Sequence, residues 1–189
     1  FFFKQKTAYE ISTRDWSSDV CSSDLTVTID GGSGNDTITG TNLGDQIVGG
    51  SGLDVLTGGK GADIFDYTNL SDALIGGSAM QPMFERITDF VVGQDSFRLS
   101  VKSLAGSVAN RGTLSALTQS AIGSLLSSTT FQANAVASFG FGSRQFTAFN
   151  DATPGFSATS DAIVEITGLT YASGFNNLNQ ITEIDSGLV

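Results

Sequence analysis

A nine-residue repeat rich in glycine and aspartate constrains the fold of this chain more than any other feature of its sequence. Four copies follow one another from Gly31: GGSGNDTIT, GTNLGDQIV, GGSGLDVLT and GGKGADIFD. Their aspartates recur every nine residues, as Asp36, Asp45, Asp54 and Asp63. Two positions after each aspartate stands an apolar residue, in turn Ile38, Ile47, Leu56 and Phe65. A period this short predicts a stack of small, repeated structural units.

Each repeat divides into six turn-forming residues and three extended ones, so two repeats make one coil of eighteen residues. Stacked coils lie about 4.8 Å apart, which is the spacing of paired strands. Asp36 is therefore expected to lie against Asp54, and Asp45 against Asp63. The apolar positions point inward and fill a thin core. Glycine allows the turns to take positive φ and allows backbone carbonyls to converge.

Stacked aspartates favour a divalent cation. Two carboxylates about 5 Å apart repel each other by roughly 3 kcal/mol at an effective dielectric constant of about 20, and a hard cation between them reverses that sign. Calcium takes about six to eight oxygen ligands in a flexible geometry, whereas magnesium prefers a stricter octahedron. The spacing therefore predicts about two calcium ions, one on each side of the coil. The remaining ligands are expected from the backbone carbonyls of the turn glycines, which are Gly31, Gly32, Gly34, Gly49, Gly50 and Gly52 on one side and Gly40, Gly58, Gly59 and Gly61 on the other.

The ends of the repeat depart from this pattern. Thr41 and Leu43 stand where glycine is usual, which weakens the turn of Asp45. Asp72 falls nine residues after Asp63 without preceding glycines, so it is either a terminal ligand or an acid of a solvated loop. The alternative for the four repeat aspartates is turn formation without metal, because aspartate favours turns. Turns alone do not explain the inward apolar residue of every repeat.

The repeat resembles the RTX, or haemolysin-type, calcium-binding nonapeptide G-G-x-G-x-D-x-U-x over Gly31 to Asp66. This resemblance implies a parallel β-roll that binds calcium, belongs to a secreted extracellular or cell-surface protein, and passes through type I secretion machinery by an uncleaved export signal near the C-terminus. Calcium binding would then supply folding free energy. We expect the roll to be disordered without calcium and to fold at the roughly millimolar calcium concentrations found outside cells.

The first residues differ in character from the repeat. Residues 1–25 hold the only tryptophan and the only cysteine of the chain, Trp16 and Cys21. The segment resembles translated sequencing-adapter DNA at the edge of a contig, and it lacks the apolar stretch of a signal peptide. We therefore expect three parts: a non-native segment over 1–25, a calcium-binding roll over 26–66 and a C-terminal capping domain over 67–189. The parent protein is expected to be longer.

Beyond the repeat, the sequence FERITDFVVGQDSFRLS is expected to cover the open end of the roll, because an exposed strand edge is usually protected. It contains two further candidates for calcium, Asp89 and Asp95. An apolar stripe predicts a helix over 113–127, capped by Thr113 or Ser115. Strand-like runs follow at 135–141, 144–150 and 162–167, with clustered phenylalanines.

The predicted fold class is therefore mainly β, with a short parallel β-roll followed by a small α+β, β-rich C-terminal domain. Residues 62–184 resemble the bluetail domain of cyanobacterial surface proteins, on ITDF, TFQANAVASFGFGSRQFTAFNDATPGF and SDAIVEITG. That resemblance implies a location at the cell surface rather than a mechanism.

Composition excludes several functions. The chain has no histidine and a single cysteine among 189 residues, which rules out Ser-His-Asp and Cys-His catalysis within it and zinc held by imidazole or a thiolate cage. A net charge of -10 argues against nucleic acid, and no apolar run reaches the roughly 18 residues of a membrane span. Asp161 and Glu165 are carboxylates of the kind a glycosidase needs in pairs. Glu165 is instead expected on the solvated face of a strand.

These observations predict a chain that is not itself an enzyme, in a parent whose activity the sequence leaves open. The first hypothesis is the calcium-binding C-terminal region of a type I-secreted extracellular or surface protein. The second is the export and stability module of a secreted hydrolase, such as a protease or lipase, with its catalytic domain upstream. The third is a structural or adhesive surface-layer protein.

Overall fold

The computed structural model describes residues 27–99, 108–173 and 184–185, and every structural statement concerns these residues. The segment 1–25 and most of the C-terminal stretch expected to hold an export signal lie outside them. The fold is mainly β with long parallel ladders, as predicted. Among the described residues, no helix is long and apolar enough to cross a membrane.

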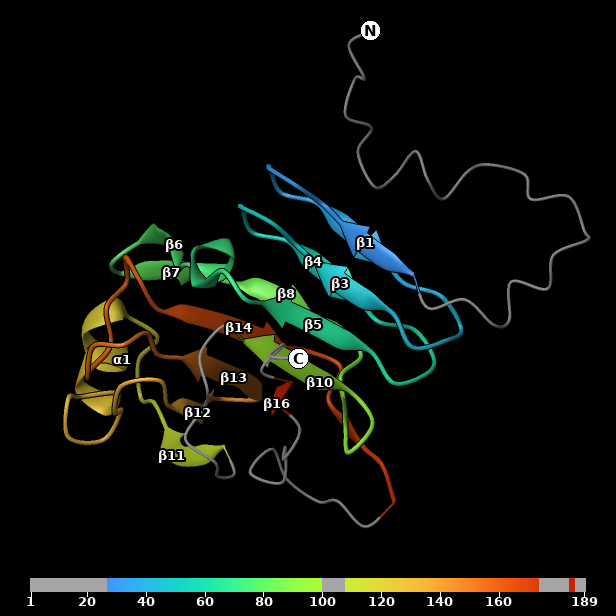
Figure 1. Ribbon diagram of the computed structural model, residues 1–189. Coiled ribbons are helices and arrows are strands. Elements are labelled where there is room, and N and C mark those ends of the chain that lie inside the picture. Colours follow the sequence, from blue (N-terminus) through green and yellow to red (C-terminus); the bar gives the residue numbers. More distant parts are fainter. Residues whose placement is uncertain (1–26, 100–107, 174–183, 186–189) are drawn as a thin grey trace, which may run out of the picture.

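The nonapeptide repeats form a roll of two facing parallel sheets, drawn blue to green in Figure 1. One sheet contains β1 (Thr28–Asp30), β3 (Gln46–Val48) and β5 (Ile64–Tyr67), and the other begins with β2 (Thr37–Thr39) and β4 (Val55–Thr57). Strands pair with the strand eighteen residues further on, so that Ile38 lies beside Leu56 and Ile47 beside Phe65. The predicted eighteen-residue coil is thus present.

The inward apolar residues are buried as the period requires. The side chains of Ile38, Ile47, Leu56 and Phe65 are each at most 1% exposed. They belong to one core cluster, which continues into Ile87 and Phe97 of the following strands. A single layer of apolar side chains therefore fills the space between the two sheets of the roll.

The roll does not stop at the fourth repeat. β8 (Glu85–Ile87) pairs in parallel with β4, and β10 (Ser96–Leu99) pairs in parallel with β5. The turn between β5 and β8 is long, and it holds the 3₁₀ helix η2 (Leu70–Ala73) and the hairpin of β6 (Gly76–Ser78) and β7 (Gln81–Met83). The turn between β8 and β10 contains β9 (Val91–Val92). The segment predicted to cover the end of the roll therefore does so as additional strands.

The second sheet of the roll runs directly into the C-terminal half. β14 (Ala162–Ile166) pairs with β8, and the sheet continues through β13 (Arg144–Phe149) and β12 (Val136–Phe141) to β11 (Ala109–Thr113). Figure 1 shows these strands side by side, and β15 (Thr170–Tyr171) and β16 (Ile184–Asp185) add to β9 and β10. Both sheets of the roll continue into strands that follow residue 66 in the chain. The predicted boundary at residue 66 between a roll and a capping domain therefore stays a prediction.

The strands expected at 135–141, 144–150 and 162–167 are confirmed, whereas the helix prediction over 113–127 was too long. Only α1 (Gln119–Leu125) is helical, and residues 109–113 form β11 against β12. The backbone N–H of Leu114 donates to Gly140 at 2.7 Å, so sheet pairing overrides the helical spacing there. Thr118 caps the helix in place of Thr113 or Ser115, and its hydroxyl accepts from Ala121 N at 3.2 Å.

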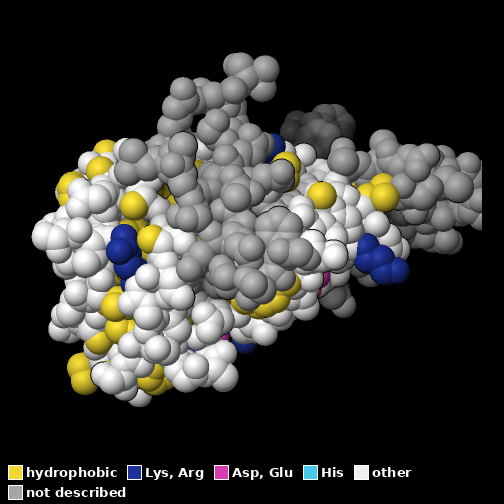
Figure 2. Space-filling view, turned by 90° about the horizontal axis from the view of Figure 1, so that it is seen from below, with side chains coloured by type: hydrophobic (Ala, Val, Ile, Leu, Met, Phe, Trp, Pro, Cys, Tyr) yellow, Lys and Arg dark blue, Asp and Glu magenta, His cyan; other side chains and the backbone are white. Residues whose placement is uncertain are grey.

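The C-terminal sheet buries both of its faces. Successive residues of β14 alternate, with Ala162 and Val164 in the core shared with the roll and Ile163 in a second core under α1. That second core contains Phe84, Ile122, Leu126, Phe131, Ala137, Phe139, Phe146, Ala148 and Ile163. On the face of the molecule in Figure 2, hydrophobic side chains lie scattered and few acidic atoms are visible.

Candidate metal centre

Two stacks of turns lie at opposite ends of the strands. The A turns follow β1, β3 and β5 and span residues 31–36, 49–54 and 68–84. The B turns follow β2, β4 and β8 and span residues 40–45, 58–63 and 88–95. Backbone hydrogen bonds join successive A turns, such as Ser51 N to Gly32 O at 2.8 Å and Gly34 N to Ser51 O at 2.9 Å. Consecutive turns of one stack are thereby held in register.

The repeat aspartates stack in pairs at the end of each turn. Asp36 N donates to Asp54 Oδ1 at 2.8 Å in the A stack. Asp45 N donates to Asp63 Oδ1 at 2.9 Å in the B stack. The structure therefore brings together both pairs of acids that the eighteen-residue coil predicts.

Three of these four aspartates are almost completely removed from solvent, whereas Asp36 is half-buried. Asp45 is 2% exposed, and Asp54 and Asp63 are each 1% exposed. Burial is the main reason that the pKa of Asp54 rises to about 6, with the charge of Asp36 adding to it. Burial likewise raises the pKa of Asp63 to about 6, with the charges of Asp95 and Asp45 contributing. A cation within each pair would offset both the burial and the repulsion.

The turn glycines leave room for oxygen atoms of the neighbouring coil. Gly50 has a φ of 88° and Gly52 a φ of 152°. A Cβ on Gly50 would collide with Gly32 O, and a Cβ on Gly52 with Gly34 O. On the other side of the same interface, a Cβ on Gly31 would collide with Gly49 O and lie 3.1 Å from Asp36 Oδ2. The glycines thus allow carbonyl and carboxylate oxygens to approach one another.

The B turns repeat this arrangement with one irregular member. A Cβ on Gly40 would collide with Gly58 O, and one on Gly59 with Thr41 O. Thr41, which stands in a glycine position, donates its backbone N–H to Asp45 Oδ2 at 2.5 Å, and its hydroxyl accepts from Leu43 N at 3.1 Å. The turn of Asp45 therefore forms despite its two missing glycines.

The donor set of the A stack fits a calcium ion best, because in the B stack both oxygens of Asp45 already accept backbone N–H groups, from Val27 and Thr41. Asp36 Oδ2 and Asp54 Oδ2 are buried and have no hydrogen-bond partner among the described residues. Carboxylate and carbonyl oxygens are the ligands that calcium prefers. No group of three or more acidic side chains in the described part of the chain forms a metal cluster. Each site would accordingly combine two carboxylates with backbone carbonyls.

One further acid in each stack occupies the aspartate position of the next turn. Neither acid belongs to a nonapeptide repeat. Val55 N donates to Asp36 O at 2.9 Å, and Arg86 N donates to Asp54 O at the same distance, so Glu85 follows Asp54 in the A stack. Ser96 N likewise donates to Asp63 O at 2.9 Å, and Asp63 N donates to Asp95 Oδ1 at 3.1 Å. Asp95 was already a candidate from the sequence, whereas Glu85 was missed because long turns replace the nine-residue spacing.

Asp72 lies in η2 of the third A turn, where Asn69 Nδ2 donates to its Oδ1 at 2.9 Å. Burial raises the pKa of Asp72, with the charges of Asp30 and Asp66 contributing. The charge of Asp72 in turn raises the pKa of Asp54 and Glu85. Asp72 thus lies close enough to the A stack to act on it electrostatically, whereas a role as ligand stays a prediction.

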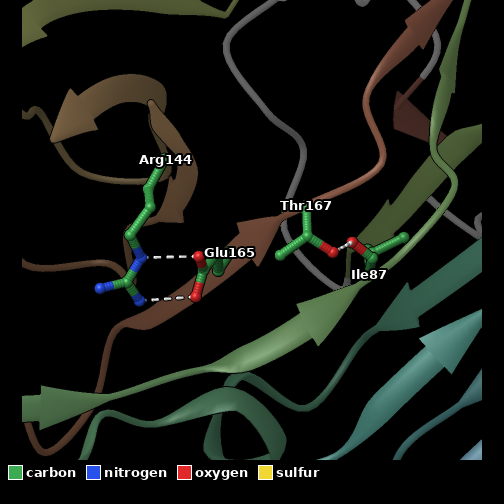
Figure 3. Close-up of polar contacts among 4 residues, drawn as sticks. All are labelled: Ile87, Arg144, Glu165 and Thr167. Carbon is green, nitrogen blue, oxygen red and sulfur yellow. Dashed lines mark hydrogen bonds and ion pairs between the residues drawn. The ribbon is translucent and has the colours of Figure 1, made fainter. Parts of the chain in front are cut away.

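The expected solvent exposure of Glu165 was wrong. Glu165 is 6% exposed, and it binds Arg144 through two hydrogen bonds of 2.7 and 2.6 Å (Figure 3). The guanidinium of Arg144 also lies 5.1 Å from the ring centre of Phe146 and 5.9 Å from that of Phe84. Both carboxylate oxygens are thus engaged in a structural ion pair. Nearby, Thr167 Oγ1 donates to Ile87 O at 3.3 Å, which ties β14 to β8.

Comparison with known proteins identifies the family. The profile of the family described as "Peptidase M10 serralysin C terminal" matches residues 18–124, which is more than half of the chain. The chain belongs to the peptidase M10 serralysin C-terminal family. A search of curated proteins gave no match. The match begins inside the segment 1–25, so the adapter origin of that segment stays a prediction.

One solved structure also matches this chain over most of its length. It is the solution structure of the AlgE6R3 subunit of the mannuronan C5-epimerase from Azotobacter vinelandii, with 22% identity over 87% of this chain and 87% of that chain. The TM-score is 0.37, a level at which the likeness supports no statement about this chain. The function of the chain is therefore inferred from the serralysin C-terminal family, the parallel roll and the stacked acids.

Proposed function

We propose that this chain is the calcium-binding roll region of a secreted extracellular or cell-surface protein, and that calcium orders the roll after export. The observation on which this rests is the pair of stacked carboxylates in each turn stack, Asp36 with Asp54 and Asp45 with Asp63. Backbone carbonyls of the turn glycines would complete the ligand set. Calcium would supply electrostatic cross-linking between coils, while the protein supplies the apolar layer that aligns them.

The same geometry supports the proposal that calcium acts as a folding switch. Where calcium is scarce, buried aspartates without counter-charges oppose formation of the turns. Where it is abundant, the sites exist only when coils are stacked, so binding free energy contributes directly to folding. A chain that stays unfolded inside the cell suits passage through type I secretion machinery, and the serralysin C-terminal family supports that assignment.

Calorimetric titration of the whole chain with calcium chloride tests the proposal. The double variant Asp36→Asn/Asp45→Asn retains side-chain size but removes one carboxylate from each site. We expect the wild-type chain to bind calcium with measurable heat and the double variant to bind two ions fewer. Asp151→Asn, in the loop between β13 and β14, is the matched control and should bind as the wild type does. No heat in the wild type, or equal stoichiometry in the double variant, would contradict the proposal.

A second candidate concerns the parent protein. The family description names a peptidase, which favours the stability and export module of a secreted hydrolase over a structural or adhesive surface-layer protein and over the bluetail assignment. We propose that the parent is a secreted protease with its catalytic domain upstream. Sequencing the full gene tests this: an H-E-x-x-H zinc-protease motif upstream supports it, and an upstream region made only of further repeats would contradict it.

A further inference from the structure

The third turn closes the roll differently in the two stacks. In the B stack the protein itself satisfies the end of the roll. Asp89 accepts from Gly58 N and Gly59 N, each at 2.8 Å. Asp95 accepts from Asp63 N at 3.1 Å and from Val91 N at 2.7 Å. All four carboxylate oxygens therefore have a backbone donor. Gln94 Nε2 donates to the Gly61 carbonyl, so a side-chain amide occupies the place next to that oxygen.

The A stack ends on an acid that is only half satisfied. Glu85 is fully buried at 0% exposure, and Tyr67 donates its hydroxyl to Glu85 Oε1 at 2.6 Å. Glu85 Oε2 has no hydrogen-bond partner among the described residues, and neither has Asp54 Oδ2 of the preceding turn. Two acids of adjacent turns therefore each retain one buried, unpartnered oxygen.

The two carboxylates converge on the same point. A methyl group placed on Gly49 would lie 2.6 Å from Asp54 Oδ2 and 3.2 Å from Glu85 Oε1. Only a residue without a side chain leaves this space open to both acids. Asp72, in the same third turn, adds negative potential here, since its charge acts on both Asp54 and Glu85.

A bound proton does not resolve this arrangement. Burial raises the pKa of Glu85 to about 8, so the site holds a proton readily when metal is absent. A proton shared between Glu85 and Asp54 would neutralise only one of the two carboxylates, and the charge of Asp72 adds to the negative potential that remains. A divalent cation would offset both negative charges together.

We propose that Asp54 and Glu85 hold a further calcium ion between the second and third A turns, with Tyr67 as the residue that positions Glu85. This inference rests on the proposed function, because Asp54 also belongs to the site with Asp36. Asp54 would then bridge two cations, one on each side of the second A turn. The B stack has no counterpart, because Asp89, Asp95 and Gln94 already satisfy its end. The predicted total for the chain becomes three calcium ions rather than two.

Counting bound metal by native mass spectrometry of the whole chain tests the inference. We expect three calcium ions in the wild type, two in Glu85→Gln, two in Asp36→Asn and one in Asp54→Asn. Glutamine keeps the length of the side chain and an oxygen that accepts from Tyr67. Glu85→Asp, which keeps the charge, and Asp151→Asn, which is remote, serve as controls; the second should retain three ions. A wild type with two ions and an unchanged Glu85→Gln would overturn this inference alone. A wild type that binds none would overturn the proposed function.

Terbium gives a second measurement on the unmodified protein. It replaces calcium at oxygen sites and emits when a neighbouring tyrosine is excited. Because the Tyr67 hydroxyl is 2.6 Å from Glu85, terbium at this site should be sensitised by Tyr67. We expect most of the tyrosine-sensitised emission to be lost in Glu85→Gln and kept in Asp36→Asn. Wild-type emission that is absent, or equally strong in Glu85→Gln, would overturn the assignment even if a variant failed to fold.

Discussion

The strands β2, β4 and β8 of the roll share one continuous sheet with β12 to β14, but the turns of the roll and these C-terminal strands differ in what stabilises them. The C-terminal strands bury both faces, with close aromatic pairs such as Phe139 and Phe146, whose ring centres are 5.0 Å apart. The turns bury carboxylates instead, with Asp54 and Asp63 each 1% exposed. The first region is therefore expected to be stabilised mainly by apolar packing. The second region encloses negative charge that only a counter-charge or a proton offsets.

The two regions meet at a small aromatic junction. Tyr67 of β5 stacks on Phe149 of β13 with ring centres 5.4 Å apart, and Phe97 of β10 meets Phe149 edge-on at 5.0 Å. The hydroxyl of this same Tyr67 binds Glu85 in the A stack. The aromatic rings of the C-terminal half therefore contact both the core of the roll and the residue that binds Glu85.

The largest effect is expected from the aromatic core under α1. Phe146→Ala removes the ring that packs on Phe84 at 4.9 Å and on Phe139 at 5.0 Å. Truncation of a buried phenylalanine costs about 3–5 kcal/mol. Denaturant unfolding should show this loss equally in calcium and in chelator. Leu56→Ala in the roll is the comparison, and its cost of about 2–5 kcal/mol should appear only with calcium. A calcium-dependent cost for Phe146→Ala would show that the two regions are not separately stabilised.

A smaller effect is expected from the turn glycines. Gly50 has a φ of 88°, and a Cβ there would collide with Gly32 O. Gly34 has a φ of 119°, but a Cβ there has open space around it. Alanine at positive φ costs roughly 1–2 kcal/mol, so Gly34→Ala should lose about that much. Gly50→Ala should lose more and bind calcium at least about tenfold more weakly, since each tenfold corresponds to about 1.4 kcal/mol.

Titration with calcium and thermal unfolding of both glycine variants measure the difference. Equal losses for Gly50→Ala and Gly34→Ala would mean that strain at positive φ, and not the approach of the neighbouring carbonyl, decides the role of these glycines.

The smallest effect concerns pH. Without metal, burial raises the pKa of Asp54, Asp63 and Asp95 from 3.8 to about 6, and that of Glu85 from 4.5 to about 8. The folded state then holds protons that the unfolded state has released, so its stability falls as pH rises from about 4 through 6 and on to 8. We expect the chelated protein to lose stability on the order of 2 kcal/mol across this range.

With calcium the dependence should reverse, because protons compete with the metal for the same carboxylates and binding weakens as pH falls below about 6. Thermal unfolding at several pH values, with calcium and with chelator, measures both slopes. Slopes of the same sign in both conditions would contradict the role of these acids in binding.

The nine-residue period of the sequence is sufficient to predict the coils of the roll and the pairing of their aspartates. A fixed interval of nine residues specifies which residues share a coil, so the pairing of Asp36 with Asp54 and the burial of Leu56 follow from counting. Glu85 was missed because the third A turn is 17 residues long, from 68 to 84, and no spacing connects it to Asp54. The register becomes visible in the structure, where Val55 pairs with Arg86 and Arg86 N donates to Asp54 O.

Other misses arose where tertiary pairing competes with local pattern. Residues 109–113 join the sheet beside β12 although the apolar stripe after them is helical in spacing. Glu165 is buried because Arg144, on the neighbouring strand, provides both a counter-charge and two donors. A single strand pattern cannot reveal a partner that comes from 21 residues away.

Hydrogen exchange with and without calcium tests the central claim most directly, because it reports on both regions of one molecule at once. At calcium concentrations about a hundredfold above Kd, one site adds about 2.7 kcal/mol, so amides of residues 36–64 should gain at least about a hundredfold protection over the chelated protein. Amides of β12, β13 and β14 should change much less. Equal protection of the turns in calcium and in chelator would contradict the claim that metal between stacked acids orders the roll.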